Sequence, residues 1–254
     1  MDTKTKPEIN VDIKSAGIQS AVVYAPLDKA LEALTEKGYR VIFLPENVRL
    51  RIQQGPRSFI SRNGNWTGEG VIYFPNGKPK LVRTSPILLS AKEATQAHKS
   101  REEFYPSQNQ IDQALIDSID FPQENIKIPT DRLSEEALTV WAFGGEKEAR
   151  AYGEFLREAG IKEMPVYAVN KNRISRQNSP FARQIWFKYL GDGSGLGGYA
   201  RSIMHGYAGR LCGLKIDLED ALCRENKPEK EFSIFPKLED ISLRLLSQNR
   251  QALF

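Results

Sequence analysis

The spacing of apolar residues predicts alternating strands and helices in the first part of the chain. Two short, continuous apolar runs, VVYA at 22–25 and VIFL at 41–44, are typical of strands buried on both faces. Between them, residues 27–38 place an apolar side chain at every third or fourth position, and Gly38 follows where a helix is expected to end. This segment predicts a strand–helix–strand (βαβ) unit with parallel strands.

A second βαβ unit is predicted around the middle of the chain. Residues 138–143 (LTVWAF) and 164–169 (MPVYAV) have the apolar composition of buried strands. The segment between them, 144–160, carries a helical apolar stripe and ends in Gly160. The pattern therefore predicts an α/β fold with mixed α and β elements and at least two βαβ units.

The remaining segments predict a hairpin, helices and a domain boundary. Residues 70–83 contain two strand-like runs joined around Asn76-Gly77, which is a strong signal for a β-hairpin insertion. Residues 91–118 are predicted to be mostly helical, and so is the C-terminal segment 235–254. Residues 121–131, with two prolines and no helical stripe, are the expected linker between a first α/β domain, 1–120, and a second α/β domain or half, 132–254, which holds a basic glycine loop and the C-terminal helix.

Composition places the chain among ordinary folded proteins. It has 254 residues, of which 40% are hydrophobic and 27% charged, with a net charge of +4. No apolar run reaches the roughly 20 residues of a membrane helix, and the polar start does not read as a signal peptide. Two cysteines are too few for a secreted disulfide framework. We therefore expect a cytoplasmic protein without a membrane partner.

Charge is distributed unevenly and suggests a partner. Two segments, 47–92 and 164–216, are strongly basic and contain aromatic residues, whereas 101–163 is acidic. Cations suit phosphates and rings suit unpaired bases, so the main functional prediction is nucleic-acid binding, to RNA or DNA. The alternative is that these cations are merely solvated and the rings belong to the core. The predicted phosphate contacts are Arg49, Arg51, Arg57, Arg62, Lys171, Arg173, Arg176, Arg183, Lys188 and Arg201, and the predicted stacking rings are Phe59, Trp66, Phe181 and Trp186.

A glycine-rich stretch, KYLGDGSGLGGYAR at 188–201, lies inside the second basic segment. It satisfies the GxGxxG pattern, but the polar strand before it and the glycines after it argue against a dinucleotide fold and against NAD. We expect Gly193, Gly195 and Gly198 to form a loop that contacts an anion, with a helix starting near Tyr199. The competing interpretation is a plain hinge.

Two further function classes stay open. The first is an enzyme that acts on a nucleotide or phosphorylated small molecule at the glycine loop, with His205 as its candidate acid–base. No cofactor is firmly implied and no metal site is predicted, although the acidic residues at 217–220 would suit Mg²⁺ if the protein were a nuclease. The second is a protein-interaction module, because the last four residues, QALF, resemble the glutamine-plus-aromatic tails that dock on sliding clamps. The same Leu-Phe end could instead fold back on the core. The sequence names neither the ligand nor the reaction, if there is one.

Overall fold

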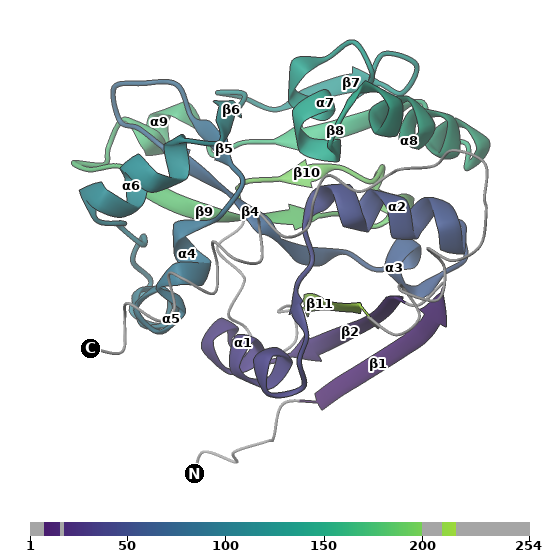
Figure 1. The fold of residues 1–254 in the computed structure, drawn as a ribbon. Helices are drawn as coiled ribbons and strands as arrows, with labels where there is room; N and C mark the ends of the chain where they lie inside the picture. The colour runs from purple at the N-terminus through teal and green to yellow at the C-terminus, as the bar shows by residue number, and fades with distance from the viewer. Residues whose placement is uncertain (1–7, 16–17, 200–209, 217–254) are drawn as a thin grey trace. The chain divides into compact units, whose positions relative to one another are not determined.

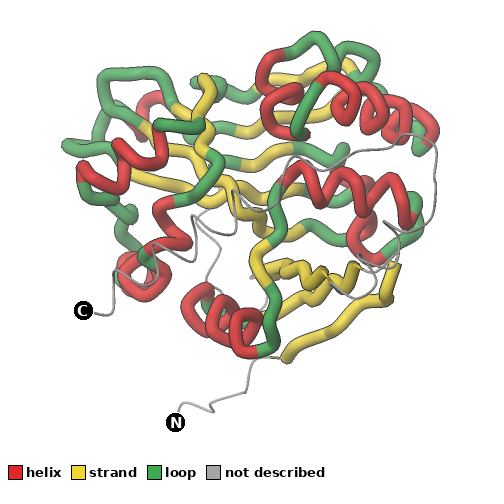
Figure 2. The backbone as a smooth tube through the Cα atoms, in the orientation of Figure 1, coloured by secondary structure: helices red, strands yellow, loops and turns green. Residues whose placement is uncertain are grey.

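The computed structural model describes residues 8–15, 18–199 and 210–216. The chain divides into two compact units, residues 1–217 and 218–254, and all described residues belong to the first unit. Within it, strands run through the middle and helices lie on both sides of them (Figures 1 and 2). The predicted mixed α/β fold is confirmed.

The elements follow one another along the chain in an irregular alternation. The strands are β1 (Glu8–Ser15), β2 (Ile18–Tyr24), β3 (Arg40–Val41), β4 (Asn65–Tyr73), β5 (Lys80–Val82), β6 (Ser118–Asp120), β7 (Ile126–Pro129), β8 (Glu163–Tyr167), β9 (Phe181–Phe187), β10 (Leu196–Gly197) and β11 (Arg210–Ile216). The helices are α1 (Leu27–Glu36), α2 (Leu44–Gln54), α3 (Phe59–Arg62), α4 (Pro86–Leu89), α5 (Ala91–Lys99), α6 (Gln108–Leu115), α7 (Ala137–Phe143), α8 (Glu146–Glu158) and α9 (Lys171–Ile174), with a short 3-10 helix at Leu190–Asp192.

The described strands join into one mixed sheet. The main order is β1-β2-β11-β4-β9-β10-β8-β7, while β3 pairs with β11 and the pair β5–β6 extends from β4. Most neighbours are antiparallel, but β11 runs parallel to β4 and β10 runs parallel to β8. The β4–β9 ladder carries a bulge between Trp66 and Gly70. Strands from both ends of the described chain, β2 and β11, thus pair with each other.

Two apolar cores flank the sheet. The larger packs α2, α7 and α8 against β4, β8 and β9, and its central side chains include Phe143, Tyr152 and Phe187. The second packs α1, α4 and α5 against β2, β11 and Trp66. Helices α1 and α8 turn their apolar stripes to these cores, as the 3.6-residue spacing in the sequence predicts.

Several predicted elements are confirmed. The strand at 20–25 and the helix at 27–38 correspond to β2 and α1, and β4 and β5 form the predicted antiparallel hairpin. Helices α5 and α6 lie in the segment 91–118, and α8 and β8 occur where the second unit places a helix and a strand. The first predicted βαβ unit differs from the prediction, because its strands β2 and β3 are not neighbours in the sheet. Strand β11 lies between them and pairs antiparallel with both.

The segment 138–143 is a helix, α7, so the prediction of a strand there is wrong. Its buried residues, Leu138, Thr139, Ala142 and Phe143, recur with helical spacing. A six-residue apolar run cannot by itself distinguish a buried strand from a short buried helix. Gly144, with φ +91°, ends α7 in the left-handed region and allows α8 to begin directly after it.

The segment after β3 also differs from the prediction, because a helix, α2, begins at Leu44. The Glu46 carboxylate accepts a hydrogen bond from the Phe43 backbone N–H, and Pro45 occupies the first turn, where it needs no donor. The buried Glu69 carboxylate on β4 accepts from the Leu44 N–H at 3.0 Å. These contacts favour a helix start over a continued strand.

Other predicted segments fall differently or lie outside the description. Residues 121–131, expected as a linker, contain β7, which pairs with β8, and the compact units divide after residue 217 instead. Residues 210–216 form β11, so the helix expected to start near Tyr199 does not extend into them. The predicted C-terminal helix and the QALF end lie outside the described residues.

Candidate functional site

Among the described residues, more than half of the cations predicted to bind phosphate make intramolecular contacts instead. Arg173 and Arg183 both donate to the carboxylate of Glu103, at 2.6 and 2.5 Å. Glu103 and Arg183 are buried, so this is an internal ion pair rather than a surface for a polyanion. Arg49 lies half-buried 3.8 Å from Glu148 on α8. Of the predicted set, Arg57, Arg62, Lys171 and Arg176 are exposed.

Arg51 is fully buried and contacts the glycine stretch from inside. Its Nη1 donates to the Ser194 hydroxyl at 2.6 Å, to the Lys188 backbone oxygen at 2.8 Å and to the Tyr152 hydroxyl at 3.1 Å. The guanidinium also lies over the Phe187 ring, 3.9 Å from its centroid. Arg51 therefore fastens the loop to α2 and α8. As a helical residue two positions from Arg49, it cannot share an exposed face with it.

The predicted stacking rings are mostly unavailable to a base. Trp66 and Phe181 are buried, at 1% and 0% exposure. Trp186 is half-buried and packs edge-on against Trp66 at 4.8 Å. Among the four, Phe59 alone is exposed, at 37%. The interpretation of these aromatics as core residues is the one that the structure supports.

The glycines of the loop serve close packing against β8. A Cβ atom at Gly195 would lie 2.3 Å from the Pro165 backbone oxygen, and one at Gly193 would lie 2.9 Å from the Pro165 ring. Gly193 also has φ +74°, in the region that favours glycine. Lys188, at the start of the loop, forms an ion pair with Asp192 and lies 4.4 Å from the Tyr167 ring centroid. Arg201, His205 and the acidic residues at 217–220 lie outside the described residues, so the enzyme alternative stays a prediction.

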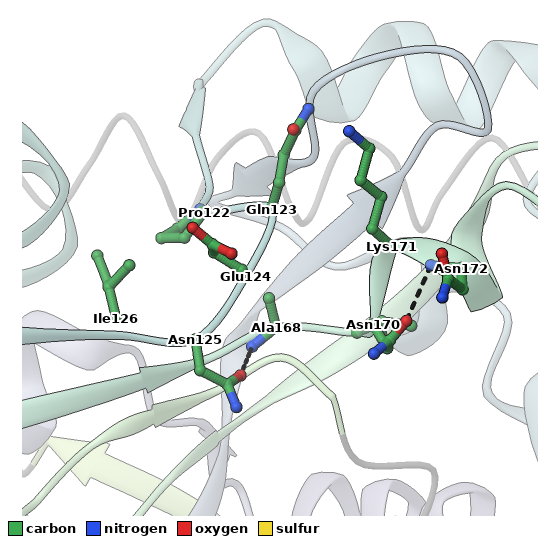
Figure 3. Close-up of a pocket in the computed structure, with 10 residues that line it drawn as sticks. Pro122, Gln123, Glu124, Asn125, Ile126, Ala168, Asn170, Lys171 and Asn172 are labelled. Carbon is green, nitrogen blue, oxygen red and sulfur yellow. Dashed lines mark hydrogen bonds between the residues drawn. The ribbon is translucent and has the colours of Figure 1, made fainter.

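A pocket of about 700 Å³ opens between two loops at one end of the sheet (Figure 3). One wall is the loop 122–126, which leads into β7. The other wall is 168–172, which leaves β8 and begins α9. Its polar lining residues are Gln123, Glu124, Asn125, Asn170, Lys171 and Asn172, and its apolar ones are Pro122, Ile126, Ala168 and Val169.

Hydrogen bonds from backbone N–H groups to side chains hold the two walls in place. The Asn125 side-chain oxygen accepts from the Ala168 N–H at 3.0 Å, which joins one wall to the other (Figure 3). The Val169 N–H donates to the buried Tyr73 hydroxyl at 3.2 Å, and that hydroxyl donates to the Gly198 oxygen at 3.0 Å. Burial raises the pKa of Tyr73 above its usual range, so the phenol stays protonated and can donate. The pocket backbone is thus fixed from the core side.

A second set of contacts supports α9. The Asn170 side-chain oxygen accepts from the Asn172 N–H at 2.9 Å and caps this short helix (Figure 3). Arg173, one residue further, is the partner of the buried Glu103 described above. The wall formed by 168–172 is therefore anchored at both of its ends.

Gln123, Glu124 and Lys171 remain available to a ligand. All three side chains are exposed, and none has a hydrogen bond or ion pair with another described residue. Figure 3 shows Gln123 and Lys171 extending in the same direction from opposite walls. The pocket can therefore offer both hydrogen-bond donors and acceptors at its opening.

Sequence reasoning found Lys171 but missed the other polar residues of the pocket. Residues 122–125 were expected as part of a linker, and the asparagines at 170 and 172 were expected at a nucleic-acid surface. One usable signal was present. Asparagine is a favoured residue at the N-cap of a helix, and Asn170 directly precedes the KNRI run that forms α9. Nothing local in the sequence indicates that the two loops meet.

In the described part of the chain, no group of three or more His, Cys, Asp or Glu side chains could hold a metal ion. No helix there is long and apolar enough to cross a membrane. Cys212 lies buried on β11.

Comparison with known proteins gives a fold. No family model matches the chain, and no curated protein matches it. One solved structure, described as "Accommodation of massive sequence variation in Nanoarchaeota by the C-type lectin fold", is similar with a TM-score of 0.56. The similarity covers 84% of this chain and 99% of the other, at 16% sequence identity. The prediction of nucleic-acid binding is wrong, because the fold is similar to a C-type lectin fold and the predicted contacts are largely buried or paired.

Proposed function

We propose that this protein is a binding module that holds a saccharide in the pocket between residues 122–126 and 168–172. The observation that carries the proposal is the lining of this pocket. Four of its ten residues, Gln123, Asn125, Asn170 and Asn172, carry a side-chain amide. A carboxamide offers a donor and an acceptor side by side, as a sugar hydroxyl does. The volume of about 700 Å³ lies within the range of small-molecule sites.

Two further features support the proposal. The pocket backbone is fixed by Asn125, Tyr73 and Asn170, so little order has to be imposed when a ligand binds. The fold is similar to one described as a C-type lectin fold, a scaffold reported in that protein to accommodate massive sequence variation. A scaffold of this kind can carry different binding surfaces on the same core.

The proposal is tested by titrating the ¹⁵N-labelled protein with glucose, galactose, mannose and N-acetylglucosamine. We expect amide shifts confined to 122–126 and 168–172 for at least one sugar. The double variant Gln123→Ala/Asn172→Ala should weaken that binding about tenfold, because two neutral hydrogen bonds of about 0.7 kcal/mol each contribute about 1.4 kcal/mol together. These two side chains make no described contact within the fold.

A matched control exists on α6. Gln113→Ala/Asn109→Ala removes the same two residue types from an exposed helix away from the pocket. This variant should bind as the unmodified protein does. Absence of shifts at the pocket with every sugar, or an equal loss of affinity in the control, would contradict the proposed function.

A further inference from the structure

The orientation of two side-chain amides in the pocket follows from the hydrogen bonds that they accept. The Asn125 and Asn170 side chains each accept a hydrogen bond from a backbone N–H, from Ala168 at 3.0 Å and from Asn172 at 2.9 Å. A backbone N–H can only donate, so the side-chain oxygen of each asparagine must face it. The amide nitrogen of each asparagine is then left to point elsewhere.

This arrangement makes the pocket richer in donors than its composition suggests. The two Nδ2 groups make no hydrogen bond with another described residue, and each carries two N–H donors. Lys171 adds an ammonium group with three donors and no described partner. Against them, the one ionised acceptor among the lining residues is Glu124.

A donor-rich pocket with one ammonium group favours a ligand that presents anionic oxygen. Hydrogen bonds between an ionised donor and an ionised acceptor are about twice as strong as neutral ones. Pro122, Ile126 and Val169 add apolar surface beside these donors, which suits the C–H face of a sugar ring better than a bare inorganic ion.

We propose that the ligand of this pocket is a saccharide that carries a carboxylate, with Lys171 at the carboxylate and the two asparagine nitrogens at the hydroxyls. The inference rests on the proposed function, since it concerns the same pocket. It assigns opposite effects to the two charged side chains: Lys171 raises affinity for an acidic sugar, and Glu124 lowers it by repulsion between like charges.

The test uses three probes that differ only at one carbon: D-glucuronate, its methyl ester and D-glucose. We expect glucuronate to bind about tenfold more tightly than the other two, with an advantage that shrinks as salt concentration rises. Lys171→Gln should remove the advantage of glucuronate over both glucose and the methyl ester. Glu124→Gln should strengthen glucuronate binding severalfold. Lys99→Gln, at an exposed position of α5, is the matched control and should change neither.

The outcomes separate this inference from the proposed function. If glucose and glucuronate bind the pocket equally, or if Lys171→Gln weakens both to the same extent, the carboxylate assignment is wrong and the saccharide function stands. If glucose 6-phosphate binds and glucuronate does not, the anion is a phosphate and the assignment is also wrong. If no probe shifts the pocket amides, both proposals are wrong.

Discussion

Glu69 is a single buried carboxylate on which the start of α2 depends. Its side chain has no exposure, accepts from the Leu44 N–H and from Arg83 at 3.2 Å, and lies in the central strand β4. Burial raises the pKa of Glu69 from 4.5 to about 7, and the charge of Arg83 only partly opposes this. The folded protein therefore takes up a proton at this group more readily than the unfolded chain does.

The pH dependence of stability follows from that difference. With a folded-state pKa above the unfolded one, the contribution of Glu69 to stability is fully present below pH 4.5 and is lost as the pH rises through about 7. We expect the free energy of unfolding to decline by roughly 3 kcal/mol from this group across that interval. Glu69→Gln should remove the decline, as measured by urea unfolding at several pH values.

The matched control is Glu93→Gln, which changes an exposed carboxylate on α5. Its pH profile should follow that of the unmodified protein. Parallel profiles for Glu69→Gln and the unmodified protein would contradict the assignment of this decline to Glu69.

The burial and the partners of individual side chains were the hardest features to predict from the sequence. Arg51, Arg183 and Trp66 belong to residue types that often serve as ligand contacts, and the structure buries all three. Burial depends on partners far away in the sequence, such as Glu103 for Arg183, which lies 80 positions away. A single sequence read locally gives the chemistry of a side chain but not its neighbours.

At the scale of elements, the Tyr73 hydroxyl joins three strand ends. It lies at the end of β4, accepts from Val169 just beyond β8 and donates to Gly198 just beyond β10. Gly198 has no spare space, because a Cβ atom there would lie 2.9 Å from the Tyr73 hydroxyl and 3.0 Å from both Phe121 and Val71. Phe121 immediately precedes the other wall of the pocket.

Tyr73→Phe should therefore loosen the pocket without unfolding the protein. Loss of the hydroxyl leaves the Val169 N–H and the Gly198 oxygen without their partner, at a cost of about 1–3 kcal/mol. Hydrogen exchange at the Val169 amide should accelerate at least tenfold. Tyr105→Phe, at an exposed tyrosine that bonds Gln177, is the control and should leave Val169 exchange unchanged. Equal exchange rates in the two variants would contradict the bridging role.

Elements with a long apolar stripe were predictable, and short apolar runs were not. Helices α1 and α8, with 10 and 13 residues, show their stripe in the sequence, and the Asn76-Gly77 turn signals its hairpin. By contrast, α7 has seven residues, and its apolar run suits either state. The start of α2 depends on a buried carboxylate 25 residues away, which no local pattern reveals.

At the scale of the whole described unit, Arg51 connects segments that are distant in the sequence. It lies on α2, and its partners are Tyr152 on α8 and Ser194 and Lys188 around the glycine loop. The loop that the sequence presents as open to an anion is therefore tied to an internal cation. Its glycines allow a close approach to Pro165 on β8.

Arg51→Lys should be strongly destabilising although it keeps the charge. A lysine ammonium lacks the planar guanidinium that lies over the Phe187 ring while its Nη1 donates to Ser194 and Lys188, so we expect a loss of roughly 2–4 kcal/mol in unfolding free energy. Exchange of the 190–195 amides should increase as well. Arg49→Lys, at a half-buried position 3.8 Å from Glu148, should cost less than about 1 kcal/mol. Similar losses in both variants would show that Arg51 has no special role.

The residues that hold the pocket walls differ from the residues at its opening, and this difference has an evolutionary consequence. The walls are held by Asn125, Asn170 and Tyr73, whereas Gln123, Glu124 and Lys171 make no described contact with the rest of the fold. Mutations at these last three positions are almost free of selection for stability. Under the proposed function, a few substitutions at the opening would change the ligand while the scaffold stays unaltered.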